Sequence, residues 1–261
     1  MRTCVTVEKK EGICILKLNR PDSFNALNQV LIEELLAEVE GCARSSDTRV
    51  IVVTGTGKGF CAGGDLRHIS EALPVPPSET LGRMTRFLHL LISDLRWMRQ
   101  PVIAAINGTV AGAGLSLALA CDLRVASDTA KFRQAYTSSG LVPDGGWTAF
   151  VPAVLGLGRA MQMALLDPVI DAQTALSWGL VHDICPQEEV MPKAVEWAQR
   201  LAEGSAVALG EAKMLLNRTA LPILERVLED ERRAMMSVAS SEEAREGINA
   251  FLEKRRPVFR R

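Results

Sequence analysis

The sequence has no run of about 18 apolar residues, the length that a helix needs to cross a bilayer. It also has no excess of one charge, because 30 Lys and Arg residues stand against 31 Asp and Glu residues, for a formal net charge of −1. Proteins dedicated to nucleic acids usually carry a basic excess. We therefore expect no membrane-spanning segment and no nucleic-acid partner.

Cysteine and histidine are few and scattered. The six cysteines form no Cys-x-x-Cys pair and have apolar flanks, so the sequence predicts neither a zinc site nor a disulfide framework. We expect His68 and His89 to be surface or packing residues, the sequence indicates no partner for His182, and none of the three is expected to bind a metal. The N-terminal segment is unlike a signal or transit peptide. Reduced thiols and this N-terminus together predict a cytoplasmic protein.

The chain can bury a large core, since 48% of its 261 residues are hydrophobic. Its first part alternates predicted strands and helices, and the part beyond about residue 158 reads as helical, which favours an α/β core with a helical C-terminal region. The apolar run "RVIVVTG" (49–55) is typical of a strand covered on both faces. Further strands are predicted in 4–19, 101–108 and 123–127, and helices in 31–42, 76–98 and 111–121.

Glycines directly follow two of these predicted strands. The first such stretch is "KGFCAGGDLRHIS" (58–70). Neither "GAGLSL" (112–117) nor "GTGKGF" (55–60) completes a dinucleotide fingerprint, and neither has the Lys-Ser or Lys-Thr pair of a phosphate loop. "GLSLA" (114–118) ends in alanine where a serine-hydrolase elbow needs glycine, so we interpret Ser116 as a small packing residue.

Two backbone N–H groups aimed at one carbonyl oxygen are a third use for such glycines. Gly64 follows one buried strand, and Ala113 follows another at a predicted helix start. N–H groups at such a position lack intrahelical acceptors and gain from the helix dipole. Together they would form an oxyanion hole for an enolate. Tight packing of strand against helix would explain either glycine cluster alone.

Five stretches together resemble one family, the crotonase superfamily of enoyl-CoA hydratases and isomerases. The resemblance rests on "NRPDSFNAL" (19–27), "FCAGGDL" (60–66), "PVIAAINGTVAGAGLSLALACDLRVAS" (101–127), "FRQAYTSSGLVPDGGWT" (132–148) and "GRAMQMALLDPVIDAQTALSWGLVHDICP" (158–186). It covers nearly the whole chain. Several motifs in the expected order are more specific than any one of them.

The resemblance implies an α/β fold with a ββα spiral core in 1–195 and a helical trimerisation region in 196–261. It implies an acyl-CoA thioester substrate, no metal or redox cofactor, and a homotrimer or dimer of trimers. The oxyanion donors would be the N–H groups of Gly64 and Ala113; the family commonly has glycine at position 113. The residues implied for the CoA portion are Phe24, Ala26, Leu27, Ala62, Gly63, Asp65 and Leu66. We expect Tyr136 and Trp147 beside the substrate, with Trp147 as pocket wall or core. The basic tail 253–261 would meet CoA phosphates or solvent.

Departures from the family pattern bear on the reaction. Hydratases of the family use two glutamates, and the corresponding positions here hold Ser116 and Tyr136. Neither can act as a carboxylate, which argues against ordinary water addition. Asp144 in "GLVPDGG" remains, and it resembles the acidic residue of the Asp-dependent isomerase branch. One carboxylate can move a proton between two carbons of the same substrate.

The sequence therefore predicts an enoyl-CoA isomerase with Asp144 as acid and base. An aspartate before a helix start can also be only a cap. A hydratase, another Asp-dependent lyase and an aromatic acyl-CoA dehalogenase stay open, the last because the aromatic residues Tyr136 and Trp147 lie near Asp144 in sequence. The alternative without catalysis is a subunit that binds CoA esters.

Overall fold

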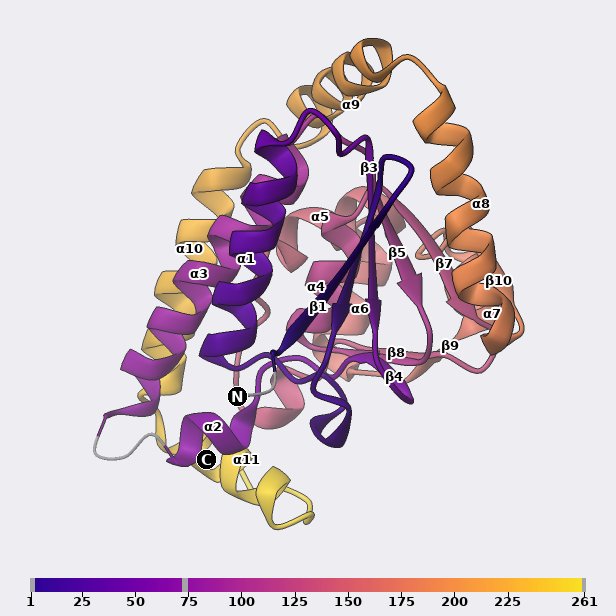
Figure 1. Ribbon diagram of the computed structural model, residues 1–261. Helices are drawn as coiled ribbons and strands as arrows, with labels where there is room; N and C mark the ends of the chain where they lie inside the picture. The colour runs from indigo at the N-terminus through magenta and orange to yellow at the C-terminus, as the bar shows by residue number, and fades with distance from the viewer. Residues whose placement is uncertain (1–2, 72–74, 260–261) are drawn as a thin grey trace.

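The computed structural model of the protein describes residues 3–71 and 75–259. Two β-sheets form its centre, and helices pack around them (Figure 1). The larger sheet has six strands in the order β1-β2-β3-β5-β7-β10, namely Val5–Lys10, Ile13–Leu18, Val50–Gly55, Val102–Ile106, Leu123–Ser127 and Asp183–Cys185. The smaller sheet has the order β4-β6-β8-β9, namely Gly59–Cys61, Thr109–Ala111, Lys131–Arg133 and Ile170–Asp171.

The chain repeats one path through the two sheets. The strand pairs β3–β4, β5–β6 and β7–β8 each place their first strand in the larger sheet and their second in the smaller one. Helices α2 (Leu66–Glu71) and α3 (Pro77–Trp97) follow β4, and α4 (Ala113–Ala120) follows β6. This is the ββα repetition predicted from the motifs. The loops from the second strand of a pair to its helix bring the glycine stretches together.

The remaining helices begin with α1 (Gln29–Arg44), which leads from the hairpin to β3. They continue with α5 (Trp147–Leu155), α6 (Leu157–Leu166), α7 (Ala172–Ser177), α8 (Val190–Glu203), α9 (Ala206–Ala220), α10 (Leu224–Ala239) and α11 (Glu242–Leu252). Three 3₁₀ turns are η1 (Pro21–Ser23), η2 (Thr137–Ser139) and η3 (Gln187–Glu189). Helices α1, α3 and α10 lie side by side, and α8 lies on the opposite side of the larger sheet (Figure 1).

Burial on both faces explains the continuous apolar run of β3. Because successive side chains of a strand point to opposite faces, Val50 and Val52 pack with α8, while Ile51 and Val53 belong to the main core that contains α1 and α3. All four side chains are fully buried. A strand covered on one face only would alternate with polar residues.

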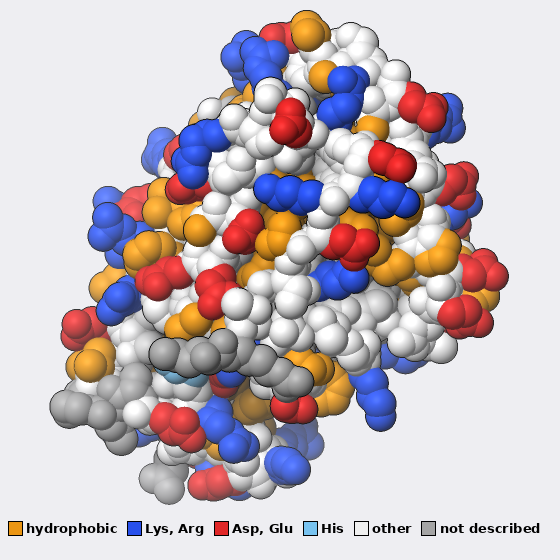
Figure 2. Space-filling view, in the orientation of Figure 1, with side chains coloured by type: hydrophobic (Ala, Val, Ile, Leu, Met, Phe, Trp, Pro, Cys, Tyr) orange, Lys and Arg blue, Asp and Glu red, His pale blue; other side chains and the backbone are white. Residues whose placement is uncertain are grey.

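The C-terminal helices pack against the rest of the chain. Helix α10 contacts α3 and α5, and α11 contacts α2 and η2. The predicted boundary between 195 and 196 falls inside α8, and the division into two regions stays a prediction. Acidic and basic side chains are interspersed on the face shown in Figure 2. No helix in the described part of the chain is long and apolar enough to span a membrane.

Candidate active site

Two adjoining cavities meet at the glycine loop after β4. The first, of about 260 Å³, is walled by apolar side chains from α1, α2 and α3 and by the loop before α5. The second, of about 840 Å³, is lined by the segment before α1, by the same glycine loop and by the end of α11. Both share Ala62, Gly64, Leu66 and Phe251. A ligand with a bulky polar part and a smaller apolar part could therefore occupy both cavities.

The backbone of the glycine loop presents one N–H group to the first cavity. Leu27 donates from its N–H to the Gly63 carbonyl at 2.7 Å, and its own carbonyl accepts from the Asp65 N–H at 2.9 Å. Because adjacent N–H groups of an extended chain point in opposite directions, the Gly64 N–H faces away from Leu27. Gly64 lines the cavity, and its N–H has no hydrogen-bond acceptor among residues 3–71 and 75–259.

Ala113 is the first residue of α4 and supplies a second N–H group. Its amide precedes the intrahelical hydrogen bonds, and no other acceptor for it occurs in the described part of the chain. Ala113 lines the same cavity as Gly64. The positive end of the helix dipole adds to the attraction for negative charge. Both predicted oxyanion donors thus open onto one cavity.

Glycines are needed here because two backbones touch. A Cβ atom at Gly114 would lie 2.3 Å from the Cys61 carbonyl oxygen, and one at Gly63 would lie 2.8 Å from the Ala111 oxygen. Gly63 also has a φ of +93°, which side chains disfavour. Close packing of the two backbones thus keeps Gly64 and Ala113 on the lining of one cavity, so it is compatible with the predicted use of their N–H groups.

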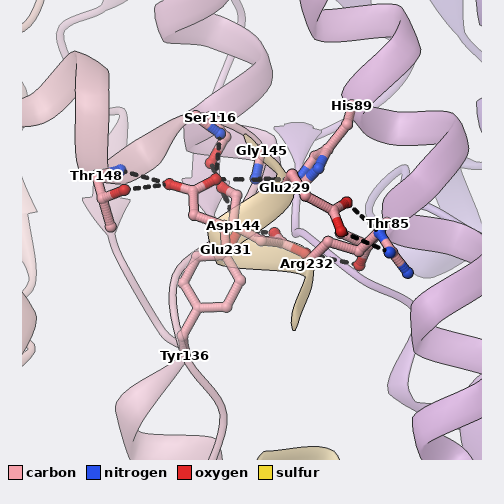
Figure 3. Close-up of polar contacts among 11 residues, drawn as sticks. Thr85, His89, Ser116, Tyr136, Asp144, Gly145, Thr148, Glu229, Glu231 and Arg232 are labelled. Atoms are coloured by element: carbon pink, nitrogen blue, oxygen red, sulfur yellow. Dashed lines mark hydrogen bonds and ion pairs between the residues drawn. The ribbon is translucent and has the colours of Figure 1, made fainter. Parts of the chain in front are cut away.

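Asp144 lines the same cavity as Gly64 and Ala113. Two hydroxyl groups hold its side chain (Figure 3). Tyr136 donates from its hydroxyl to Oδ1 at 2.7 Å, and Thr85 of α3 donates to Oδ2 at 2.9 Å. The Asp144 backbone carbonyl accepts from the Ser116 hydroxyl at 2.6 Å. Ser116 and Tyr136, at the positions where the resemblance places the glutamates of hydratases, therefore both hold Asp144.

The electrostatics of Asp144 combine two opposed effects. Burial raises the pKa of its carboxyl group, whereas the hydrogen bonds from Tyr136 and Thr85 lower the pKa by stabilising the carboxylate. Burial raises the pKa of Tyr136 well above its ordinary value, so its hydroxyl stays protonated and can donate. Asp144 is the single acidic residue among the described residues that line the first cavity. This arrangement suits a carboxylate that takes up and returns one proton.

A second polar group, missed in the sequence, fixes the turn after Asp144. Glu231 of α10 accepts from the Gly146 N–H at 2.7 Å, the Thr148 N–H at 2.9 Å and the Thr148 hydroxyl. His89 of α3 accepts from the Gly145 N–H at 3.0 Å. Burial lowers the pKa of His89 to about 4, which leaves its ring neutral and able to accept.

The sequence does hold a signal for these residues. Glu231 lies on the buried stripe of α10, with Leu228 and Met235. Thr85 and His89 lie one turn apart on the buried face of α3. Polar side chains on an otherwise apolar helix face require partners, because an unpaired buried polar group is costly.

The predicted CoA-binding residues divide between the two cavities. Leu27, Ala62 and Leu66 line the first, together with Tyr136. The second is lined by Phe24, Ala26, Ala62, Asp65 and Leu66, and by Lys254 from the basic tail; residues 260–261 of that tail lie outside the described residues.

Other predicted residues lie elsewhere. Gly63 supports the loop without lining either cavity. Trp147 is buried at the start of α5 and lines neither cavity within the described chain, so its large ring packs in the core. His182 has a partner that the sequence did not indicate, since its Nδ1 accepts from the Arg124 N–H at 3.0 Å.

With this geometry in place, comparisons with known proteins become informative. The sequence model for "Enoyl-CoA hydratase/isomerase" matches residues 8–261. The chain belongs to this family. The resemblance found in the motifs is thus confirmed, and an acyl-CoA thioester is the substrate class that fits the family.

Named relatives in the family differ in reaction. The chain is 36% identical to "1,2-epoxyphenylacetyl-CoA isomerase" of Escherichia coli K12 over 251 residues, which are 96% of this chain and 95% of that protein. It is 34% identical to "2,3-dehydroadipyl-CoA hydratase" of the same strain over 254 residues, 97% of each chain. An enoyl-CoA hydratase structure from Mycobacterium avium subsp. paratuberculosis K-10 superposes with a TM-score of 0.90 at 33% identity, covering 99% of both chains. This likeness confirms the predicted fold class.

Proposed function

We propose that this enzyme is an enoyl-CoA isomerase, which moves a carbon–carbon double bond of an enoyl-CoA with Asp144 as acid and base. The observation that carries the proposal is that one buried carboxylate and two N–H groups, which have no acceptor among the described residues, line the same cavity. The hydratase pattern of the family needs two carboxylates. Here, Ser116 and Tyr136 hold Asp144 by hydrogen bonds.

The reaction balances within the substrate. The Asp144 carboxylate takes a proton from the carbon next to the thioester of a 3-enoyl-CoA. The electron pair moves into the thioester, and the resulting dienolate oxygen accepts from the Gly64 and Ala113 N–H groups. The protonated Asp144 then gives the proton to the carbon at position 4, and the double bond forms between carbons 2 and 3. The product has the same mass as the substrate.

Tyr136 and Thr85 orient the carboxyl group throughout this cycle. Each donates to one carboxylate oxygen, so the ionised form is stabilised when the reaction begins. Burial opposes that effect and keeps the group basic enough to remove a carbon-bound proton. An environment that balances these two effects is what a reversible proton carrier needs.

The two cavities fit a CoA thioester. The acyl chain would occupy the first, whose apolar walls come from residues such as Ile32, Leu81, Met84 and Leu88. The CoA portion would lie in the second, where Arg67 and Lys254 offer positive charge to phosphates, while Arg20 is paired with Asp65 at 2.8 Å. Gly64 belongs to both linings, so the thioester would sit at their junction. We propose no metal or redox cofactor, because enolate formation here uses only N–H donors and one carboxylate.

Hydration is the second candidate, because the 34%-identical E. coli relative is named a hydratase. It would require a group other than the two family glutamates to activate water. Purified protein incubated separately with a 3-enoyl-CoA and a 2-enoyl-CoA separates the two reactions by product mass. Mass-neutral conversion of the 3-enoyl substrate is the expected result. A product heavier by one water from the 2-enoyl substrate, without isomerisation, would replace isomerase by hydratase. If neither substrate is converted, a cyclic or aromatic acyl-CoA substrate, or a subunit that only binds CoA esters, would be favoured.

We also propose that the chain assembles as a homotrimer or a dimer of trimers. Leu157, Met161 and Leu165 lie at intervals of four residues on α6 and are more than half exposed, as is Val169 just beyond the helix. A row of exposed apolar side chains on one helix face is typical of a surface covered in an oligomer. Light scattering with size-exclusion chromatography gives the mass, and a monomer at micromolar concentration would contradict this assembly. The six unpaired cysteines fit work in a reducing compartment such as the cytoplasm.

A further inference from the structure

The turn between Asp144 and α5 has no side-chain support of its own. Gly145 and Gly146 have φ values of +68° and +80°, both in the left-handed region. Gly146 is the N-cap residue of α5 and has no side chain to accept from the first helical N–H groups. Such groups need acceptors from elsewhere when they are buried. The conformation that places Asp144 therefore depends on residues outside this segment.

Glu231 of α10 supplies those acceptors from 83 to 85 positions further along the chain. Its Oε2 accepts from the Gly146 N–H, and its Oε1 accepts from the Thr148 N–H and hydroxyl. A carboxylate there also complements the positive end of the helix dipole. The Glu231 side chain is only 4% exposed, and Figure 3 shows it beside Thr148 and Asp144. Glu231 therefore accepts the hydrogen bonds that the side chain of an N-cap residue normally accepts at the start of a helix.

The turn is also held on its other side. His89 accepts from the Gly145 N–H, and Ser116 donates to the Asp144 carbonyl. Neither Glu231 nor His89 lines the cavity within the described chain. Their effect on substrate can therefore only pass through the position of Asp144.

We propose that Glu231 is a positioning residue, whose carboxylate fixes the Gly146–Thr148 turn and thereby aims Asp144 at the substrate carbon. The proposal rests on the proposed function, because it concerns the same carboxylate. It assigns to the C-terminal region a role in the chemistry of the site, in addition to the assembly role predicted for it. No contact between Glu231 and substrate is needed.

The geometry selects a sharp test, Glu231→Gln. Glutamine has the same shape, but one oxygen becomes an NH₂ group. Because each carboxylate oxygen accepts from a backbone N–H, either orientation of the amide places NH₂ against another N–H donor. At least one cap hydrogen bond is lost and one repulsive contact is gained, because Oε2 accepts one hydrogen bond and Oε1 accepts two. The matched control is Asp230→Asn on the same helix, whose exposed side chain pairs, among the described residues, only with Arg226 at 3.9 Å.

The kinetic readout is the split between kcat and KM for a 3-enoyl-CoA at pH 8. A misaimed base slows the chemical step, since a displacement of about 1 Å can cost roughly 100-fold. For Glu231→Gln we expect kcat to fall about 10- to 100-fold and KM to change less than about 3-fold. Asp230→Asn should retain wild-type values. A folded Glu231→Gln variant with wild-type kcat would overturn the proposal. A loss of kcat/KM of about 10- to 100-fold that came from a higher KM alone would also overturn it.

Hydrogen–deuterium exchange separates this proposal from the function on which it rests. Peptides covering 144–150 should exchange faster in Glu231→Gln than in wild type or Asp230→Asn. If wild type is inactive on enoyl-CoA but this exchange increases, the proposed reaction fails and the cap stands. If wild type is active but exchange and kcat are unchanged in the variant, the positioning role fails. Should Glu231→Gln not fold, Thr148→Val removes one of the three donors, and several-fold lower kcat with unchanged KM is expected; an unchanged kcat would overturn the proposal.

Discussion

Gly114→Ala is the substitution that most directly perturbs the proposed oxyanion hole without removing a donor. The added Cβ would lie 2.3 Å from the Cys61 carbonyl oxygen and 2.9 Å from its carbonyl carbon. Both are backbone atoms, so no side chain can rotate away. Ordinary carbon contacts begin near 3.5 Å, so α4 must separate from the end of β4, and from the glycine loop that continues it, by about 1 Å.

That separation has two measurable consequences. Overpacking of this kind destabilises folded proteins by about 1–3 kcal/mol. It also spreads the N–H groups of Gly64 and Ala113, which lie on the two segments that move apart. Loss of one oxyanion donor lowers kcat by about 100- to 1,000-fold, so we expect a loss near the lower end of that range.

The assay is kcat for a 3-enoyl-CoA, followed by absorbance of the conjugated product, together with urea unfolding. Gly41→Ala is the matched control, because a Cβ at Gly41 in α1 would meet no described atom within 4 Å outside its chain neighbours and the adjacent backbone of the helix. It should leave kcat unchanged and stabilise the fold by up to about 1 kcal/mol. Gly114→Ala with wild-type kcat and wild-type stability would refute both the backbone contact and the argument for paired donors.

Two further predictions concern titration. Tyr136→Phe removes a hydrogen bond that favours ionised Asp144, so the acid limb of the kcat/KM–pH profile should move to higher pH. A hydrogen bond to a charged group is worth about 1.5–3 kcal/mol, which corresponds to a shift of about 1–2 pH units. An acid limb at the wild-type pH would contradict the contact between Tyr136 and Asp144. Burial raises the pKa of Glu231 from its ordinary 4.5 to about 7, against the opposing effect of its hydrogen bonds. The folded state thus holds this proton more tightly than the unfolded state. The resulting contribution to the free energy of unfolding, roughly 3 kcal/mol, is fully present below pH 4.5 and is lost as the pH rises through about 7. Urea unfolding should show most of this loss of stability between pH 5 and pH 8 in wild type, and a smaller loss in Glu231→Gln. Equal losses in the two proteins would contradict the raised pKa of Glu231.

Periodicity and turn chemistry predicted most of the larger elements near the site. The run at 49–55 is β3, and the predicted helix at 76–98 is α3 with bounds one residue inside. The strands predicted in 4–19 form the hairpin β1–β2, which turns at Glu11 and Gly12 with positive φ at both. These features depend on local sequence, so they can be read from it.

The contacts around Asp144 could not be predicted in the same way. Thr85, Tyr136 and Glu231 lie 59, 8 and 87 positions away, and no local pattern says which buried polar groups will meet. For Trp147 the sequence left pocket wall and core open, and among the described residues its ring belongs to the core and to neither cavity. Trp147 is the first residue of α5, and its side chain already belongs to the core.

The most direct test of the central claim is the rate at which Asp144→Asn converts a saturating 3-enoyl-CoA to its 2-enoyl isomer. Asparagine keeps the shape of the side chain and its place beside Tyr136 and Thr85, but it cannot carry the proton. A general base contributes about 100- to 10,000-fold, so we expect a loss of at least about 100-fold, with the variant folded and still binding the CoA ester. Asp144→Asn turning over within about 10-fold of wild type would contradict the account, because the proton would then travel by another group.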